Sequence, residues 1–134
     1  MKNQRAELSP KNKYWIPKYR YLELKNFCLQ YPDWKNELRN LSVLKAHTTA
    51  ISSSDTPDPT HDLAMKRLKL EENINLIDST AELAERSIAK WLVKGITESY
   101  TYEYLKLQLD LPAGREMYYD RYRKFFYLLD KYRS

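Results

Sequence analysis

Glycine, cysteine and histidine are scarce in this chain of 134 residues, which holds two glycines, one cysteine and two histidines. A Gly-rich phosphate loop and a G-x-S-x-G nucleophile elbow are excluded, because both need several closely spaced glycines. Cys28 has no partner for an intramolecular disulfide, and together with His47 and His61 it has no zinc-ligand spacing. We therefore expect no metal, no cofactor and no enzymatic activity.

Long apolar runs are also lacking. No stretch approaches the roughly 20 apolar residues of a membrane span, and the first residues, MKNQRAELSPKNK, lack the apolar region of a signal peptide. The sequence therefore predicts a cytoplasmic protein that does not bind a membrane.

Apolar residues and basic charge are present in useful amounts. The apolar fraction is 43%, enough for a core, and with so few glycines it favours an all-α fold of about five helices. The net charge of +5 is concentrated at the chain ends: residues 1–20 hold six basic residues and one acidic residue, and residues 115–134 hold six and three. This distribution suggests a phosphate-bearing partner.

The first part of the chain divides into an arm and two helices. Residues 1–13 are polar and basic without periodicity and predict a flexible arm. Apolar residues then recur at helical spacing over 17–31, up to Pro32, and Asp33 is a suitable N-cap for a second helix. These two helices predict a helical hairpin or corner over residues 14–46.

A polar linker is predicted over residues 47–60, which are rich in Ser, Thr, Asp and Pro, and a helical domain over 61–134. Thr60 is the expected cap of a third helix that ends near Asp78. Ser79 and Glu82 fit a capping box that opens a fourth helix, and Gly95 is its expected C-terminal stop.

The last third of the chain predicts a helix-turn-helix at about 100–131. Ser99 or Thr101 can cap a short helix, which the segment LDLPAG ends at about 110–114. A long final helix then begins near Gly114 or Arg115.

The final helix has a buried stripe and an outward face. Helical spacing assigns Tyr118, Tyr122, Phe125 and Leu129 to the stripe, with Phe126 beside it. The outward residues are the candidate DNA contacts: Arg115, Glu116 and Tyr119 for base edges, with Asp120 beside them, and Arg123, Lys124, Lys131 and Arg133 for phosphates. A solvated face, with Asp120 paired to Lys124, is the alternative interpretation.

A second basic and aromatic patch lies near the start of the chain. Lys13, Lys18 and Arg20 alternate with aromatic residues such as Tyr14, a pattern that suits a phosphate backbone or stacked bases. The alternative is that the aromatic residues fill the core while the basic residues stay in water.

Residues 95–133, GITESYTYEYLKLQLDLPAGREMYYDRYRKFFYLLDKYR, resemble the C-terminal segment of small phage regulators of the RinA and ArpU type. The segment 14–44, which contains YWIPKYRYLELKNFCLQYPDWKNELRNL, is similar to the start of prophage proteins of the same size. The resemblance implies a helix-turn-helix like that of sigma-factor region 4, with a recognition helix near 115–131, and control of late phage genes.

The sequence favours the first of three functions and leaves the other two as alternatives. The first is a sequence-specific transcriptional regulator that binds duplex DNA, with RNA polymerase and further copies of the chain as candidate partners. The second is a small terminase-like DNA-binding subunit, which would form a ring. The third is a protein-interaction adaptor whose basic ends serve only solubility.

Overall fold

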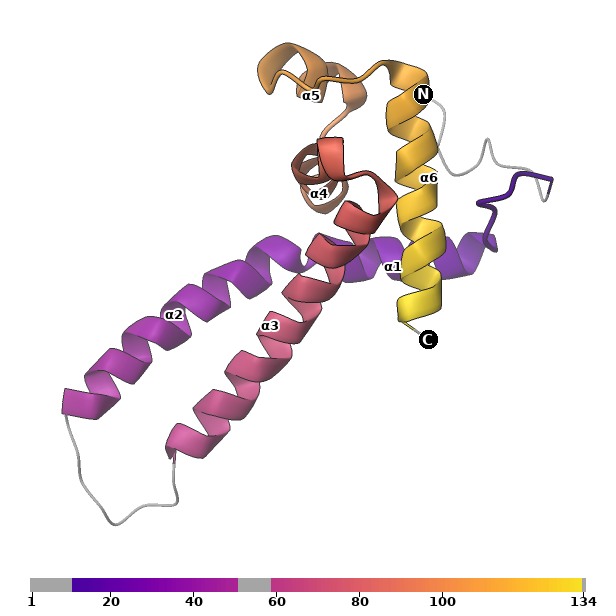
Figure 1. Ribbon diagram of the computed structural model, residues 1–134. Helices are drawn as coiled ribbons and strands as arrows, with labels where there is room; N and C mark the ends of the chain where they lie inside the picture. Colours follow the sequence, from indigo (N-terminus) through magenta and orange to yellow (C-terminus); the bar gives the residue numbers. More distant parts are fainter. Residues whose placement is uncertain (1–10, 51–58, 134) are drawn as a thin grey trace.

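The computed structural model describes residues 11–50 and 59–133, with side chains described for 11–43 and 60–133. The elements are α1 (Lys18–Leu29), α2 (Tyr31–Ala50), α3 (Pro59–Ala84), a 3₁₀ turn (Arg86–Ile88), α4 (Ala89–Thr97), α5 (Tyr102–Gln108) and α6 (Arg115–Tyr132) (Figure 1). The predicted all-α fold of about five helices is confirmed, since neither described range contains a strand. None of the helices described combines the length and apolarity of a membrane span.

The last helix, α6, is central to the core. It packs against α3, α1 and α4. Its fully buried residues belong to one apolar cluster with side chains from those three helices, including Leu24, Cys28, Ile77, Ala81, Leu92 and Ile96. Each large apolar side chain buried in this way stabilises the fold by about 1.5–3 kcal/mol, so the helix that carries the predicted reading face also holds the body together.

The first two helices meet at a corner. α1 ends at Leu29, and α2 begins at Tyr31, two residues before the predicted cap Asp33. Pro32 falls in the first turn of α2, where its missing N–H has no intrahelical partner to lose. From the corner α2 runs antiparallel to α3, and the two form a long pair that extends away from the body (Figure 1).

The predicted linker over 47–60 begins too early in the sequence. α2 continues to Ala50, so the first four residues of that segment are helical, because no proline or glycine occurs there to break the hydrogen-bond ladder. At the other end α3 begins at Pro59, a favoured first helical residue, so Thr60 lies inside the helix. Residues 51–58, and residues 1–10 of the predicted arm, lie outside the described residues.

The predicted boundary at Ser79 is wrong. α3 continues through it to Ala84, because Ile74, Ile77 and Ala81 extend one buried stripe across the proposed break. The Ser79 hydroxyl donates a hydrogen bond to a carbonyl of the preceding turn, a pattern that residues of this type adopt inside helices. The chain leaves the helix only after Ala84, where Glu85 is extended.

Gly95 does not end its helix. α4 continues to Thr97, and Gly95 is buried inside it. A Cβ built on Gly95 would overlap the hydroxyl of Tyr118 and lie 2.9 Å from Cδ1 of Leu105. The close approach of α4 to α5 and α6 therefore favours glycine at this position, and its packing role outweighs its tendency to stop a helix.

Candidate nucleic-acid interface

The short helix α5 begins as the sequence predicts. Thr101 is its N-cap, and the Thr101 hydroxyl accepts a hydrogen bond from the backbone N–H of Tyr104 at 3.1 Å. Such a cap satisfies one of the unpaired N–H groups at a helix start, which is worth about 1 kcal/mol. Of the two predicted candidates, Thr101 is therefore the cap, and Ser99 precedes it in a left-handed conformation with φ of 57°.

Hydrogen bonds from neighbouring helices fix the turn between α5 and α6. Trp91 on α4 donates to the carbonyl of Leu109 at 2.7 Å, and Tyr102 on α5 donates to the carbonyl of Ala113 at 3.1 Å. Asp110 adopts a left-handed φ of 58°, which Asp tolerates better than most residues. The predicted turn at 110–114 is confirmed, and it is held to both α4 and α5.

α6 begins at Arg115, in agreement with the sequence, and its N-cap Gly114 makes no side-chain cap. The predicted stripe is buried at Tyr118, Phe125 and Leu129, which are no more than 1% exposed, and Phe126 joins it at 2%. Tyr122 is only half-buried as a residue, but its hydroxyl lies 2.9 Å from that of Tyr21. Burial, with Tyr21 as a lesser cause, raises the pKa of Tyr122.

The first turns of α6 form the surface where most of the predicted contacts gather. A shallow concavity of about 590 Å³ lies there. Five of the eight predicted DNA contacts line it: Arg115, Glu116, Tyr119, Asp120 and Arg123. The structure therefore brings these five together on one surface, whereas Lys131 and Arg133 lie at the far end of the helix.

Arg115 is engaged within the molecule. Its guanidinium forms an ion pair with Glu103 on α5 and lies 5.6 Å from the ring centre of Tyr102 and 5.3 Å from that of Tyr119. The hydrogen bond from Arg115 lowers the pKa of Glu103. Arg115 thus joins α5 to the start of α6, a stabilising role that the sequence did not predict.

Arg121 was missed by the sequence analysis. Its Nε donates a hydrogen bond to Glu85, just beyond the end of α3, at 2.7 Å, and its Nη1 donates one to Asp120. The bond from Arg121 is the largest cause that lowers the pKa of Glu85. Because Glu85 is 36 residues away, only the folded chain reveals this pair. Asp120 is accordingly paired with Arg121 and not with Lys124.

The remaining basic residues of the outward face are not neutralised. Arg123 and Lys124 are half-buried, Lys131 is exposed, and none of the three has a carboxylate within ion-pair distance in the part of the chain that the structure describes. Nε of Arg123 is buried without a hydrogen-bond partner. These three residues therefore form no ion pair in the described ranges, and Lys124 acts on Glu85 only through a longer-range electrostatic interaction.

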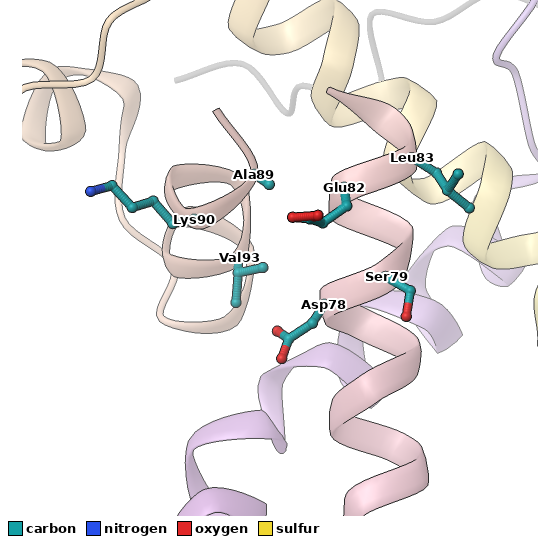
Figure 2. A pocket seen from close by; sticks show the side chains of 7 residues that line it. All are labelled: Asp78, Ser79, Glu82, Leu83, Ala89, Lys90 and Val93. Carbon is teal, nitrogen blue, oxygen red and sulfur yellow. The ribbon is translucent and has the colours of Figure 1, made fainter. Parts of the chain in front are cut away.

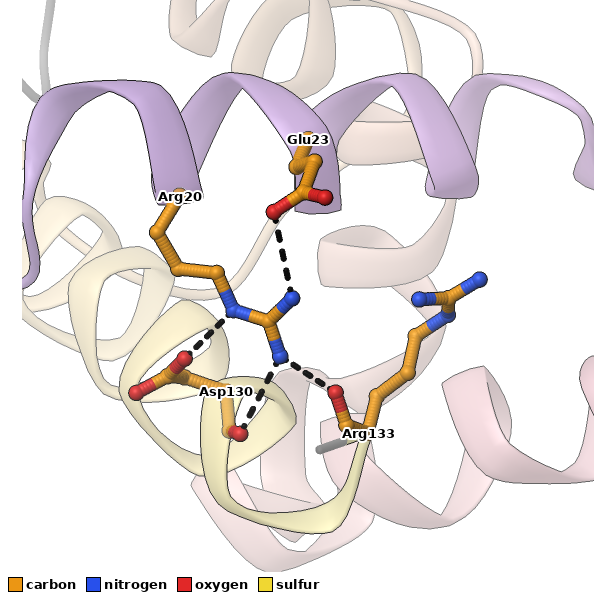
Figure 3. Close-up of polar contacts among 4 residues, drawn as sticks. All are labelled: Arg20, Glu23, Asp130 and Arg133. Atoms are coloured by element: carbon orange, nitrogen blue, oxygen red, sulfur yellow. Dashed lines mark hydrogen bonds and ion pairs between the residues drawn. The ribbon is translucent and has the colours of Figure 1, made fainter.

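The patch near the start of the chain is divided by the structure. Figure 3 shows the guanidinium of Arg20 among Glu23, Asp130 and the carbonyl of Arg133. The bond to Asp130 is 2.6 Å long and is the main cause that raises the pKa of Arg20. Arg20 therefore ties α1 to the last turn of α6, where a cation is favourable beside the carbonyl groups.

The other basic residues of this patch differ from Arg20, because Lys13 and Lys18 make no ion pair within the described ranges. Tyr14 lies beside Lys13, whose ammonium is 5.0 Å from the centre of its ring. Lys18 is exposed at the start of α1, with its ammonium 5.8 Å from the ring centre of Tyr19. The guanidinium of Arg133, another predicted phosphate contact, lies 4.0 Å from the ring centre of Phe27. Arg133 and Arg20 are thus both engaged at the C-terminal end of α6.

The structure describes the side chains of His61 and Cys28, two of the three residues considered as metal ligands in the sequence. His61 is exposed, and burial raises the pKa of the Cys28 thiol, as expected for an unreactive cysteine. A concavity of about 720 Å³ lies between α3 and α4 (Figure 2), where Asp78 and Glu82 point toward α4 and Lys90 points away from α3. No group of three potential metal ligands occurs in the part of the chain described.

Comparison of the chain with protein-family models, with curated proteins and with solved structures gave no match.

Proposed function

We propose that this chain is a sequence-specific DNA-binding transcriptional regulator of phage or prophage genes. In this proposal α5, the turn and α6 form the helix-turn-helix, and α6 is the reading helix. The observation that supports it most is the division of α6: an aromatic stripe buried in the core, and an opposite face with charged side chains from the first turn onward. The resemblance of residues 95–133 to phage regulators points the same way.

The start of α6 has groups that can bind a phosphate and the edge of a base. Its first N–H groups are not capped by a side chain, and such groups, with the helix dipole, attract anions. Glu116 is exposed in the first turn and makes no ion pair among the described residues. A carboxylate there can accept a hydrogen bond from cytosine N4 in the major groove, which is worth about 1–3 kcal/mol of discrimination.

A protein-interaction role is the second candidate, supported by apolar side chains on the long pair of α2 and α3. Val43, Met65 and Leu68 are 61%, 53% and 50% exposed, respectively. A surface of this kind suits a polymerase, a second copy of the chain or a terminase-like ring. Light scattering separates these outcomes, because a ring has a mass many times the 16.1 kDa of one chain.

The experiment that tests base reading is selection of preferred duplexes from a random pool. We expect the wild-type chain to enrich one sequence, and Glu116→Gln to change the preference at one or two positions by about 1–3 kcal/mol. Lys69→Ala, a control at an exposed position of α3, should keep the wild-type preference. An unchanged preference in Glu116→Gln would remove Glu116 as a reader, and no enrichment by the wild type would contradict sequence-specific binding.

A further inference from the structure

Two lysines and two tyrosines form a continuous row on the surface beside α6. The ring centres of Tyr14 and Tyr127 are 5.6 Å apart. The ammonium of Lys13 lies 5.0 Å from the ring centre of Tyr14, and that of Lys131 lies 4.6 Å from the ring centre of Tyr127. We call these four residues the lysine–tyrosine row. It joins the segment before α1 to the last helix, two parts of the chain that the sequence analysis treated as separate patches.

The row continues the outward face of the proposed reading helix. Tyr127 follows Arg123 by four residues, and Lys131 follows Tyr127 by another four, so the three lie along one side of α6. At a rise of 1.5 Å per residue, they span about 12 Å along the helix axis. The segment before α1 brings Lys13 to the same side, because Tyr14 packs on Tyr127.

The charges of the row are positioned without being neutralised. Lys13 and Lys131 are exposed, and neither has a carboxylate within ion-pair distance among the residues described. Asp130, the sequence neighbour of Lys131, is already bound by Arg20. An aromatic face attracts an ammonium group but leaves its positive charge in place, so both lysines can still bind an anion.

We propose that the lysine–tyrosine row binds the phosphate backbone of the same duplex whose bases α6 reads. This inference rests on the proposed function, and it assigns Lys13 a role in DNA binding that depends on the Tyr14–Tyr127 contact. Lysine contacts to phosphates add affinity and salt dependence but no base preference. The row therefore holds the duplex beside the reading helix, and Tyr14 is a positioning residue for Lys13.

The test is the salt dependence of binding to a selected duplex, compared between Lys13→Ala/Lys131→Ala and the wild type. Loss of two phosphate contacts lowers the slope of log affinity against log salt by about 1.8, so the affinity ratio between about 50 and 200 mM salt shrinks about 12-fold. The preferred sequence should not change. Tyr14→Ala, which keeps both lysines, should lower the slope by about 0.9.

The matched control is Lys35→Ala/Lys69→Ala, which removes the same charge from α2 and α3. Lys35 also lies over a tyrosine ring, 5.2 Å from the centre of Tyr31. The control should keep the wild-type slope. An unchanged slope in Lys13→Ala/Lys131→Ala, or an equal loss in the control, would overturn the row as a phosphate site while leaving base reading by Glu116 intact. No binding by the wild type would overturn the proposed function as well.

Discussion

The inner and outer faces of α6 differ in what their side chains contact. On the inner face Tyr118 and Phe125 are buried against other helices, and the approach is so close that a Cβ at residue 95 would overlap the Tyr118 hydroxyl. On the outer face Arg123 and Lys131 have no carboxylate partner among the described residues. The residues that stabilise the fold and the basic residues without an ion pair therefore lie on opposite faces of one helix. Substitutions on the inner face should lower the free energy of unfolding, and substitutions on the outer face should lower the affinity for DNA.

The basic residues at the edges of α6 divide in the same way. Arg20, Arg115 and Arg121 each bind a carboxylate of another segment, whereas Arg123, Lys124 and Lys131 bind none within the described part of the chain. Net charge alone treats all six as equivalent. The structure indicates that the first three join segments of the fold, and we propose that the second three bind the partner.

The largest expected effect comes from disturbing the inner face at Gly95. Gly95→Val places a branched side chain where the Tyr118 hydroxyl and Leu105 already lie, and we expect a loss of about 3 kcal/mol in the free energy of unfolding. Urea unfolding monitored by circular dichroism measures it. Lys90→Val, an exposed position of the same helix, is the control. Equal stability of the two variants would contradict the close packing of α4 on α6.

A smaller effect is expected at the end of α6. Arg20→Ala removes the charge-assisted bonds to Asp130 and to the carbonyl of Arg133, at a cost of about 1–2 kcal/mol in the free energy of unfolding. Lys18→Ala, two residues earlier and without an ion pair in the described region, should cost much less. If Arg20→Ala kept full stability but lowered the salt slope of DNA binding, Arg20 would belong to the available cations instead.

The smallest effect concerns the pH dependence of the ion pairs at the edges. Arg115 lowers the pKa of Glu103 below its ordinary value of 4.5. A carboxylate with a depressed pKa in the folded chain stabilises it above the unfolded pKa, and this contribution is lost as the pH falls through the folded pKa. Glu103→Gln should therefore show a shallower loss of thermal stability below about pH 4.5 than the wild type.

The control for that pH profile is Glu72→Gln, at an exposed position of α3 that makes no ion pair within the part of the chain described. It should follow the wild-type profile. Identical profiles for all three chains would show that the Glu103–Arg115 pair contributes no measurable stability.

Local signals in the sequence predicted the start of α5, the turn after it and the start of α6 well. A hydroxyl at Thr101, the breakers at Pro112 and Gly114 and the spacing of Tyr118 and Phe125 each act within one or two turns, and the structure has the cap, the turn and the buried stripe where they were expected. These features could be predicted because their causes lie within a few residues of their effects.

Features that depend on distant parts of the chain could not be predicted in this way. Ser79 has the local pattern of a helix start, but α3 continues through it because its buried stripe extends to Ala81. Gly95 has the pattern of a helix stop, yet it is needed by a tyrosine 23 residues later. The Arg20–Asp130 pair joins residues that are 110 positions apart, and the periodicity of a sequence does not indicate such a contact.

The most direct test of DNA binding is fluorescence anisotropy of the wild-type chain with a generic duplex of about 30 base pairs at about 50 and 200 mM salt. Four phosphate contacts, from Arg123, Lys124, Lys131 and Lys13, predict an affinity loss of about 150-fold over that interval. A loss of this size supports the division of α6 into a folding face and a DNA-binding face. Absence of binding at the lower salt concentration would contradict it and favour the protein-interaction role.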